Sequence, residues 1–217
     1  MSVTLQLTQL DLEPGQRLRL RAIDWRTFED ILTELGEPRN SRITYQADIL
    51  EIEMPTPEHE VDKELISDIV KLILDELELD CECFGSTTFK RPETRTGLEP
   101  DQCFYIQNHA IMRGKRRLDL ERDPPPDLAI EIDVTSKTRI DAYERIGVRE
   151  LWIYDRDRLA IYVLAPNEPH YTKQSHSPTF PQLPIVTLIE TALRDSRTIG
   201  RSPTLRQLRR QLRDLLR

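Results

Sequence analysis

Hydrophobic and polar positions alternate in several short stretches of this chain and recur at helical spacing in others. RLRLRAI at residues 17–23 alternates charged and apolar side chains, which is typical of an edge strand. Asp24 precedes WRTFEDILTELG, whose apolar residues recur on one face before Gly36, so the pattern predicts a capped helix over 25–35. SRITYQADILEIEMP contains two alternating runs around residues 46–48 and predicts a β-hairpin.

The longest amphipathic pattern before the C-terminal tail covers residues 58–77 and predicts a second helix. LDCECFGSTTFKR predicts one or two further strands with a bend near Gly85, and the polar residues that follow, up to Gly97, predict a loop. DQCFYI, which begins at Asp101, predicts another strand. Polar residues 107–126 end in three prolines and predict a mobile connection.

The second half of the chain alternates between strand and helix patterns. DLAIEIDVT predicts an apolar strand interrupted by acids, and SKTRIDAYERIG predicts a helix that ends at Gly147. RELWIYD and RLAIYVLAP predict a hairpin that turns at residues 156–158, and a short helix is expected over 185–194. Ser202 and Pro203 predict the start of a tail helix. The leucines of this helix are spaced by three and four residues, which favours packing against another helix, either in a second subunit or in the same domain.

The composition is that of a globular protein with a heavily ionised surface. Of the 217 residues, 38% are hydrophobic and 32% are charged. Because no long polar linker divides the chain, we expect one domain over residues 1–200 and a basic helical tail over 201–217. The chain starts without the basic and apolar segments of an export signal, and no stretch approaches the roughly 18 apolar residues of a membrane span. A cytoplasmic protein without a disulfide framework is therefore expected.

The net charge of −7 argues against a protein that coats nucleic acid through long-range attraction. The charge is unevenly distributed, because RSPTLRQLRRQLRDLLR at residues 201–217 carries six arginines and one acid, Asp214. From composition alone, this tail is the stretch that we expect to contact phosphate groups.

Three acidic residues interrupt or adjoin stretches that otherwise resemble buried strands. Strand alternation in DLAIEIDVT places Glu131 and Asp133 on one face, about 7 Å apart. Asp101 starts another predicted strand. An unpaired carboxylate in apolar surroundings is costly, so these acids must be solvated, paired with cations or bound to a metal. If the two strands are neighbours, the three carboxylates form a hard-oxygen site suited to Mg²⁺ or Mn²⁺.

Such a site is suited to phosphodiester hydrolysis, because a divalent cation offsets charge on phosphoryl oxygens and lowers the pKa of an attacking water. Lys137 and Arg139, at the start of the next predicted helix, are the cations available to hold a phosphate. The alternative is that the acids form salt bridges at the rim of a sheet. Nothing in the sequence resembles a Gly-rich phosphate loop, a Ser-His-Asp arrangement or a nucleotide fingerprint, so kinase, serine-hydrolase and dehydrogenase functions have no support.

The ordered series MPTPEHE, GSTTFKR, EPDQCFYI, PPPDLAIEIDVTS and YERIGVRELWIYD resembles the Uma-two (Uma2) family of restriction-endonuclease-like proteins, in the PD-(D/E)XK nuclease superfamily. The resemblance covers residues 19–166. It implies an α/β (α+β) fold with a restriction-endonuclease-like core, in which helices flank a central mixed β-sheet. It also implies a metal-dependent endonuclease that hydrolyses phosphodiester bonds in nucleic acid, with DNA as the expected substrate and Mg²⁺ or Mn²⁺ as the cofactor.

The family motif places its two acids at Asp101 and Glu131. Asp133 stands where the motif has a lysine, and the resemblance leaves it as an extra metal ligand or a group that orients water. In a variant of the family, the cationic side chain that replaces the motif lysine lies on the following helix. The residue at that position in this chain is Arg139, and Lys137 lies half a turn earlier. An arginine stays charged and cannot readily release a proton. The alternative is therefore a catalytically inactive module on the same fold that binds nucleic acid or protein.

Other residues could extend this site. Glu60 is expected either to complete the metal shell or to provide a charge favoured by the helix dipole. His59 beside it matches the same family motif, with a helix cap or a surface residue as the alternative. Lys90 either faces the cleft or is a solvated strand end. Trp152 and the tyrosine that follows two residues later, Tyr154, are expected in the core. The leucine seam of the tail favours a homodimer through the C-terminal helix.

Overall fold

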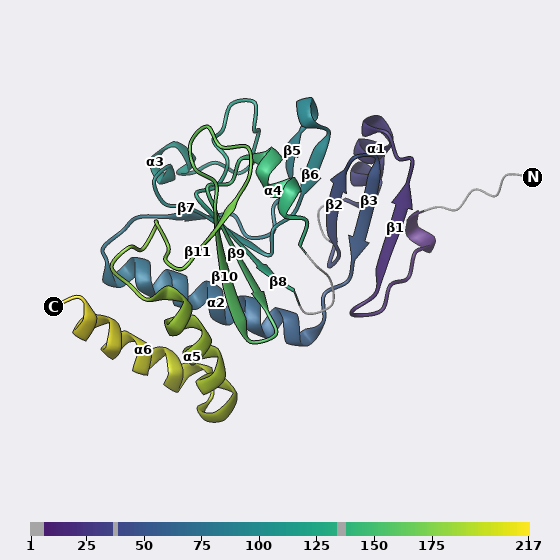
Figure 1. Cartoon of the computed structure of the whole chain (residues 1–217). Coiled ribbons are helices and arrows are strands. Elements are labelled where there is room, and N and C mark those ends of the chain that lie inside the picture. Colours follow the sequence, from purple (N-terminus) through teal and green to yellow (C-terminus); the bar gives the residue numbers. More distant parts are fainter. Residues whose placement is uncertain (1–6, 37–38, 134–137) are drawn as a thin grey trace, which may run out of the picture.

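Alternating stretches in the first hundred residues form a five-stranded antiparallel sheet in the computed structural model, which describes residues 7–36, 39–133 and 138–217. The strand order is β1-β3-β2-β6-β5 (Figure 1). The strands are β1 (Arg17–Arg21), β2 (Arg42–Gln46), β3 (Ile49–Glu53), β5 (Phe89–Arg91) and β6 (Thr96–Leu98). The predicted hairpin is confirmed: Ala47 and Asp48 join β2 to β3 with φ angles of 50° and 60°, as in a two-residue type I′ turn.

One face of this sheet is apolar, and the predicted helix, α1 (Trp25–Leu35), packs on it and buries it. The Asp24 carboxylate accepts a hydrogen bond from the Thr27 amide at 2.7 Å, which satisfies one of the free donors at the helix start. Phe28 of α1 stacks on Tyr45 of β2, with ring centroids 4.4 Å apart. The opposite face of β1, β3 and β2 carries the polar side chains of the alternating pattern.

Strand β6 corrects the prediction of a loop up to Gly97. Residues 92–94 form a short 3-10 helix, η2 (Pro92–Thr94), and β6 follows it as a fully buried strand. Gly97 is required there because a Cβ atom at this position would lie 2.5 Å from the ring of Phe28. A glycine in a short polar segment is typical of a turn in sequence terms, and only the packing of α1 explains its place in a strand.

The second sheet has six strands in the order β11-β10-β9-β8-β7-β4. Strands β8 and β9 are parallel and the other pairs are antiparallel, so this is the mixed sheet that the fold class implies. The α+β fold class is confirmed, with the five-stranded sheet as an addition. The strands are β4 (Glu82–Cys83), β7 (Gln102–Tyr105), β8 (Leu128–Ile132), β9 (Glu150–Asp155), β10 (Arg158–Val163) and β11 (Thr172–Gln174).

Helices cover both faces of the mixed sheet. On one face, α2 (Pro57–Glu76), α5 (Ile185–Ile199) and α6 (Arg201–Leu215) enclose the largest apolar cluster, which includes Trp152 and Tyr154 as predicted. The shorter helices α3 (His109–Met112) and α4 (Ile140–Ile146) contribute to the cluster on the other face. The remaining short helix is η1 (Leu7–Gln9). Within the described ranges, no helix combines the length and apolarity needed to cross a membrane.

Several predicted boundaries shift in the C-terminal part. Helix α5 extends to Ile199 instead of ending near residue 194, and a short strand, β11, lies between the second hairpin strand and this helix. Helix α6 starts one residue before Ser202, because Gly200 adopts a φ of 87° and reverses the chain between the two helices. Ser202 therefore lies within the first turn and does not cap it.

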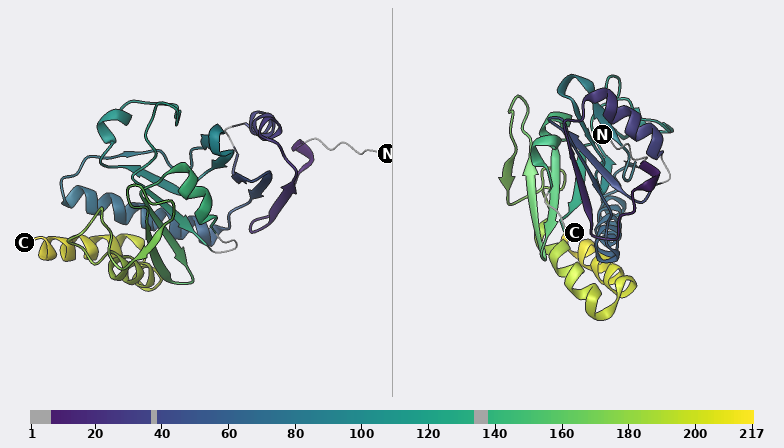
Figure 2. Two further views of the ribbon diagram at one scale, coloured as in Figure 1. Left: turned by 45° about the horizontal axis from the view of Figure 1, so that its top comes forward. Right: turned by 90° about the vertical axis from the view of Figure 1, so that its right-hand side faces the viewer.

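The leucine seam of the tail packs within the same chain. Leu208 and Leu212 are 3% and 0% exposed in the cluster shared with α2 and α5, whereas Leu215 is 49% exposed. Of the two alternatives that the sequence left open, the structure shows packing on the chain's own helices. Helices α5 and α6 lie at the end of the molecule opposite β1 (Figure 2). The homodimer, the cytoplasmic location and the domain boundary after residue 200 stay predictions.

Candidate functional site

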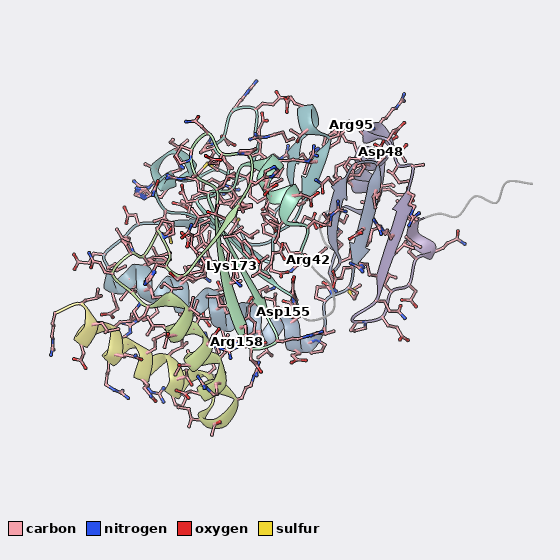
Figure 3. The ribbon with its side chains drawn as sticks, in the orientation of Figure 1. Arg42, Asp48, Arg95, Asp155, Arg158 and Lys173 are labelled. Atoms are coloured by element: carbon pink, nitrogen blue, oxygen red, sulfur yellow. The ribbon has the colours of Figure 1, made fainter. Side chains whose placement is uncertain are left out.

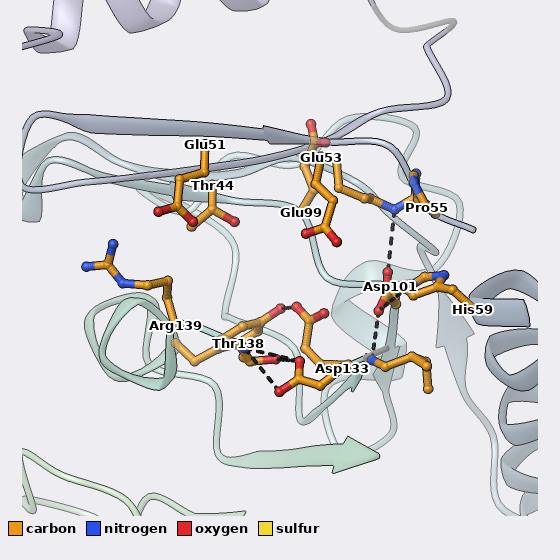
Figure 4. A pocket seen from close by; sticks show the side chains of 14 residues that line it. Thr44, Glu51, Glu53, Pro55, His59, Glu99, Asp101, Asp133, Thr138 and Arg139 are labelled. Carbon is orange, nitrogen blue, oxygen red and sulfur yellow. Dashed lines mark hydrogen bonds and ion pairs between the residues drawn. The ribbon is translucent and has the colours of Figure 1, made fainter. Parts of the chain in front are cut away.

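A pocket of about 60 Å³ lies where the polar face of the five-stranded sheet meets the end of β8 and the start of α2. This volume accommodates a few water molecules or a hydrated ion. Figure 4 shows Glu51, Glu53 and Glu99 on one wall, Asp133, Thr138 and Arg139 on the facing wall, and Asp101 with His59 at one end. Six acidic residues line the pocket in total: Glu51, Glu53, Glu99, Asp101, Glu131 and Asp133.

Strand pairing brings Asp101 and Glu131 together. Strands β7 and β8 are antiparallel neighbours with Gln102 opposite Ile130, so Asp101, which immediately precedes β7, adjoins Glu131 on β8. The Asp101 carboxylate also accepts a hydrogen bond from the Ile132 amide at 2.9 Å, which fixes its position relative to β8. Opposite residues of an antiparallel pair project from the same face of a sheet, so the two carboxyl groups are neighbours in the pocket.

The environment separates the pKa values of this pair. Burial raises the pKa of Glu131 well above its ordinary value of 4.5, and the charge of Asp101 raises it further. Burial also opposes ionisation of Asp101, but the hydrogen bond and positive charge of His59 keep the pKa of Asp101 below its ordinary value. The surroundings therefore favour a negative charge on Asp101 over one on Glu131.

Two residues that the sequence did not place in the site, Arg42 and Tyr143, support the two acids, together with His59, which is buried and does not cap α2, since Thr56 is the capping residue. His59 Nε2 lies 2.9 Å from Asp101 Oδ2, and Arg42 Nε lies 3.6 Å from Asp101 Oδ1. Tyr143 of α4 donates a hydrogen bond to Glu131. The alternation of RITYQ, which puts Arg42 on the polar face of β2, was the available signal for Arg42, although the distance to Asp101 could not be read from it (Figure 3).

Of the predicted cations, Arg139 lines the pocket, and its guanidinium donates to the Gln46 side chain at 2.8 Å. Lys137 lies outside the described residues. Lys90 is not part of the pocket lining, and its ammonium group lies 3.3 Å from Glu29 of α1.

The remaining predicted acids have their own partners. Asp133 lines the pocket and accepts hydrogen bonds from Thr138, at 3.1 Å from the amide and 2.6 Å from the hydroxyl. Glu60 is not among the lining residues. Its carboxylate is 42% exposed and pairs with Lys63 on the same helix. The structure therefore places two of the predicted acids, Asp101 and Glu131, next to each other and holds a third, Asp133, on a wall of the same pocket.

The donor set fits a hard divalent cation with a small number of protein ligands. In the part of the chain that the structure describes, no group of three or more His, Cys, Asp or Glu side chains could hold a metal ion. Mg²⁺ usually keeps several waters and is bound through one or two carboxylates together with substrate phosphates. The neighbouring carboxyl groups of Asp101 and Glu131 meet that requirement, because a cation bound by both would offset the cost of ionising them side by side.

The raised pKa of Glu131 predicts how stability depends on pH in the presence of EDTA. A carboxyl group whose pKa rises on folding stabilises the fold fully below its unfolded value of 4.5. This contribution is lost as the pH increases through the folded pKa, by up to about 1.4 kcal/mol per pH unit. Replacing Glu131 with glutamine should remove this contribution, so urea unfolding from pH 5 to 9 should show a shallower loss of stability in the variant.

His59 also contributes to the pH dependence of stability, and this contribution is present in both wild type and Glu131→Gln. Burial lowers the pKa of His59, but its hydrogen bond and charge interaction with Asp101 outweigh burial and raise it above 6.5. Its stabilising effect is therefore also lost as the pH increases, in both proteins. Equal slopes for wild type and Glu131→Gln would contradict a raised pKa of Glu131.

The sequence model of a family described as "Uma2: Putative restriction endonuclease" matches residues 25–196, a range that includes all residues lining the pocket. A solved structure of "a putative nuclease belonging to DUF820 from Anabaena variabilis ATCC 29413" is 16% identical in sequence. The alignment covers 73% of this chain and 91% of that chain, with a TM-score of 0.49. None of the curated proteins matches this chain.

Proposed function

This chain belongs to the Uma2 family of putative restriction endonucleases, and from that premise we propose that it is a metal-dependent endonuclease that hydrolyses phosphodiester bonds in nucleic acid, with DNA as the expected substrate. The observation that carries the proposal is that strand pairing places Asp101 next to Glu131 in a pocket lined by six acids. Two buried neighbouring carboxylates are costly to ionise together, and a divalent cation would offset that cost.

Asp101 and Glu131 would hold Mg²⁺ or Mn²⁺. When bound, the cation would offset charge on the phosphoryl oxygens and lower the pKa of an attacking water. His59 and the Ile132 amide orient Asp101 through hydrogen bonds of 2.9 Å each, and Tyr143 orients Glu131. Partners of this kind typically change metal affinity or activity by about 10- to 100-fold when they are removed.

Two arginines would contact the scissile phosphate. Arg42 and Arg139 both line the pocket, and each presents several N–H donors in a planar arrangement that matches phosphate oxygens. Neither can accept the proton of the attacking water. Asp133, positioned by Thr138 on the facing wall, is the carboxylate that we propose orients this water. A phosphate contact by Lys137 stays a prediction.

The test is cleavage of labelled DNA and RNA by the purified protein with Mg²⁺ or Mn²⁺, and with EDTA as the control. We expect cleavage with either metal and none in EDTA. A failure to cleave any substrate, combined with no binding of Mn²⁺ in calorimetry, would exclude the proposal.

The alternative is a module of the same fold that binds nucleic acid or protein without catalysis. Two observations favour it: Asp133 replaces the motif lysine, and no three-ligand group is found within residues 7–36, 39–133 and 138–217. Calorimetric titration with Mn²⁺ separates the two functions, because the inactive module need not show metal uptake that depends on Asp101 and Glu131. Metal uptake without cleavage would indicate a nuclease that was not given its substrate or partner.

A further inference from the structure

Strand β1 carries a row of three exposed arginines on one face. Its sequence is RLRLR, so Arg17, Arg19 and Arg21 point to one side, and Leu18 and Leu20 point to the apolar side covered by α1. We call the three residues the β1 arginine row. The side chains of Arg17 and Arg19 are 43% and 46% exposed, so much of each guanidinium faces solvent.

The β1 arginine row continues the wall of the acidic pocket. Arg19 is opposite Glu51 in the β1–β3 pairing, with 3.1 Å between Arg19 Nε and the Glu51 carboxylate. Arg17 Nη1 lies 3.6 Å from the same carboxylate, and Glu51 itself lines the pocket. The arginine row, the glutamates of β3 and Arg42 of β2 thus follow one another across a single sheet face. Figure 1 shows β1 as the outermost strand of this sheet.

Two glutamates of β3 face the row: Glu51 pairs with Arg17 and Arg19, and Glu53 is opposite Arg17 in the strand register. Arg21 is opposite the apolar Ile49, so the three arginines exceed the two glutamates by one positive charge. A chain of net charge −7 with six acids around its pocket repels a polyanion. Positive charge beside the pocket reduces this repulsion. Alternate residues of a strand are about 6.8 Å apart, so the three guanidiniums can contact successive phosphates of one nucleic-acid strand.

The basic tail helix is less suited to the same role. Arg201 and Arg213 of α6 pair with Asp68 and Glu76 of α2. Helix α6 also lies at the opposite end of the molecule from β1 and packs on α2 and α5, away from the pocket (Figures 1 and 2). The surface that composition alone indicated for phosphate contact is thus remote from the acids.

We propose that the β1 arginine row binds the sugar-phosphate backbone of the nucleic acid whose scissile phosphate enters the pocket. This inference rests on the proposed function. The row lies before residue 25, where the family match begins, so it is a feature of this chain that the match does not cover. Contacts to phosphates position a nucleic acid without reading its sequence, so the binding is independent of base sequence.

The test measures binding in EDTA, where metal-dependent cleavage does not occur. The variant Arg17→Gln/Arg19→Gln/Arg21→Gln is titrated with a fluorescein-labelled DNA duplex of about 30 base pairs at several salt concentrations. Each phosphate contact that is lost should lower the slope of log K against log salt by about 1. We expect a slope that is smaller by about 2 to 3, and affinity about tenfold or more lower at 0.1 M salt, for unrelated DNA sequences alike.

The control variant is Arg206→Gln/Arg210→Gln/Arg217→Gln, which removes the same charge from exposed positions of α6 or just after it. It should bind like wild type. The single variant Arg21→Gln leaves the pairs with Glu51 intact and should lower the slope by about 1, so the inference can be tested even if the triple variant unfolds. Equal losses in both triple variants, or no loss in the β1 variant, would overturn the inference.

The two proposals fail separately. If binding depends on the β1 arginine row but Mg²⁺ and Mn²⁺ never support cleavage, only the proposed function fails. If the protein cleaves DNA and the β1 triple variant binds and cleaves like wild type, only the inference fails, and the arginines would then serve to keep an exposed strand edge from pairing with other chains.

Discussion

Replacing Asp101 with asparagine is expected to lower the rate of nucleic-acid cleavage about 10³-fold or more, which corresponds to about 4 kcal/mol of transition-state stabilisation. Asparagine has nearly the same shape and can still accept hydrogen bonds from His59 and the Ile132 amide. What it lacks is the negative charge that, with Glu131, would hold a divalent cation. The measurement is single-turnover cleavage in Mg²⁺ or Mn²⁺, together with calorimetric titration of the metal.

Asp48→Asn is the matched control, because it removes the same charge at the turn between β2 and β3. Asp48 is 44% exposed, pairs with Arg95 and is absent from the pocket lining. Figure 3 shows this pair at the end of the hairpin away from Arg42. The control should cleave at the wild-type rate. If Asp101→Asn also cleaves at that rate, with unchanged dependence on metal, Asp101 is not a metal ligand in this protein.

Replacing Glu99 with alanine is expected to lower the free energy of unfolding by about 3–5 kcal/mol. Glu99 is 6% exposed and accepts hydrogen bonds from Arg39, from Thr88 and, at 3.1 Å, from the Ile43 amide. Its removal leaves the Arg39 guanidinium, which is 13% exposed, without its carboxylate. Urea unfolding measures the loss, and we expect the melting temperature to fall by about 10 °C.

The loss arises from the isolated charge on Arg39 and does not measure a net benefit of the ion pair. Burial raises the pKa of Glu99 despite the hydrogen bonds and the positive charge of Arg39, which shows how costly its ionised form is. The double variant Arg39→Met/Glu99→Leu should therefore recover much of the stability. As a control, Glu29→Ala breaks an exposed pair with Lys90 and should cost about 1 kcal/mol or less. A loss of less than that in Glu99→Ala would refute this account.

Local patterns predicted the elements that are stabilised by nearby residues. Asp24 caps α1 through Thr27, three residues away, and the turn at Ala47 and Asp48 joins two strands of clear alternation. The strand around Gly97 was missed because its reason is the ring of Phe28, which is distant in sequence. The tail helix was predicted, but its partner was not, because a leucine seam is equally compatible with α2 and α5 of the same chain and with another subunit.

The sequence by itself determined the hairpins, the amphipathic helices and the presence of acids in strand-like stretches, because these follow from spacing within one segment, whereas the α+β class was expected from the family resemblance. Only the tertiary structure decided that Asp101 meets Glu131, that Asp133 turns to Thr138, and that Arg42 reaches the site from another sheet. It also decided that the exposed arginines nearest the acids come from β1 and not from the tail. Strand pairing and helix packing join residues far apart in sequence, and these contacts depend on the whole fold.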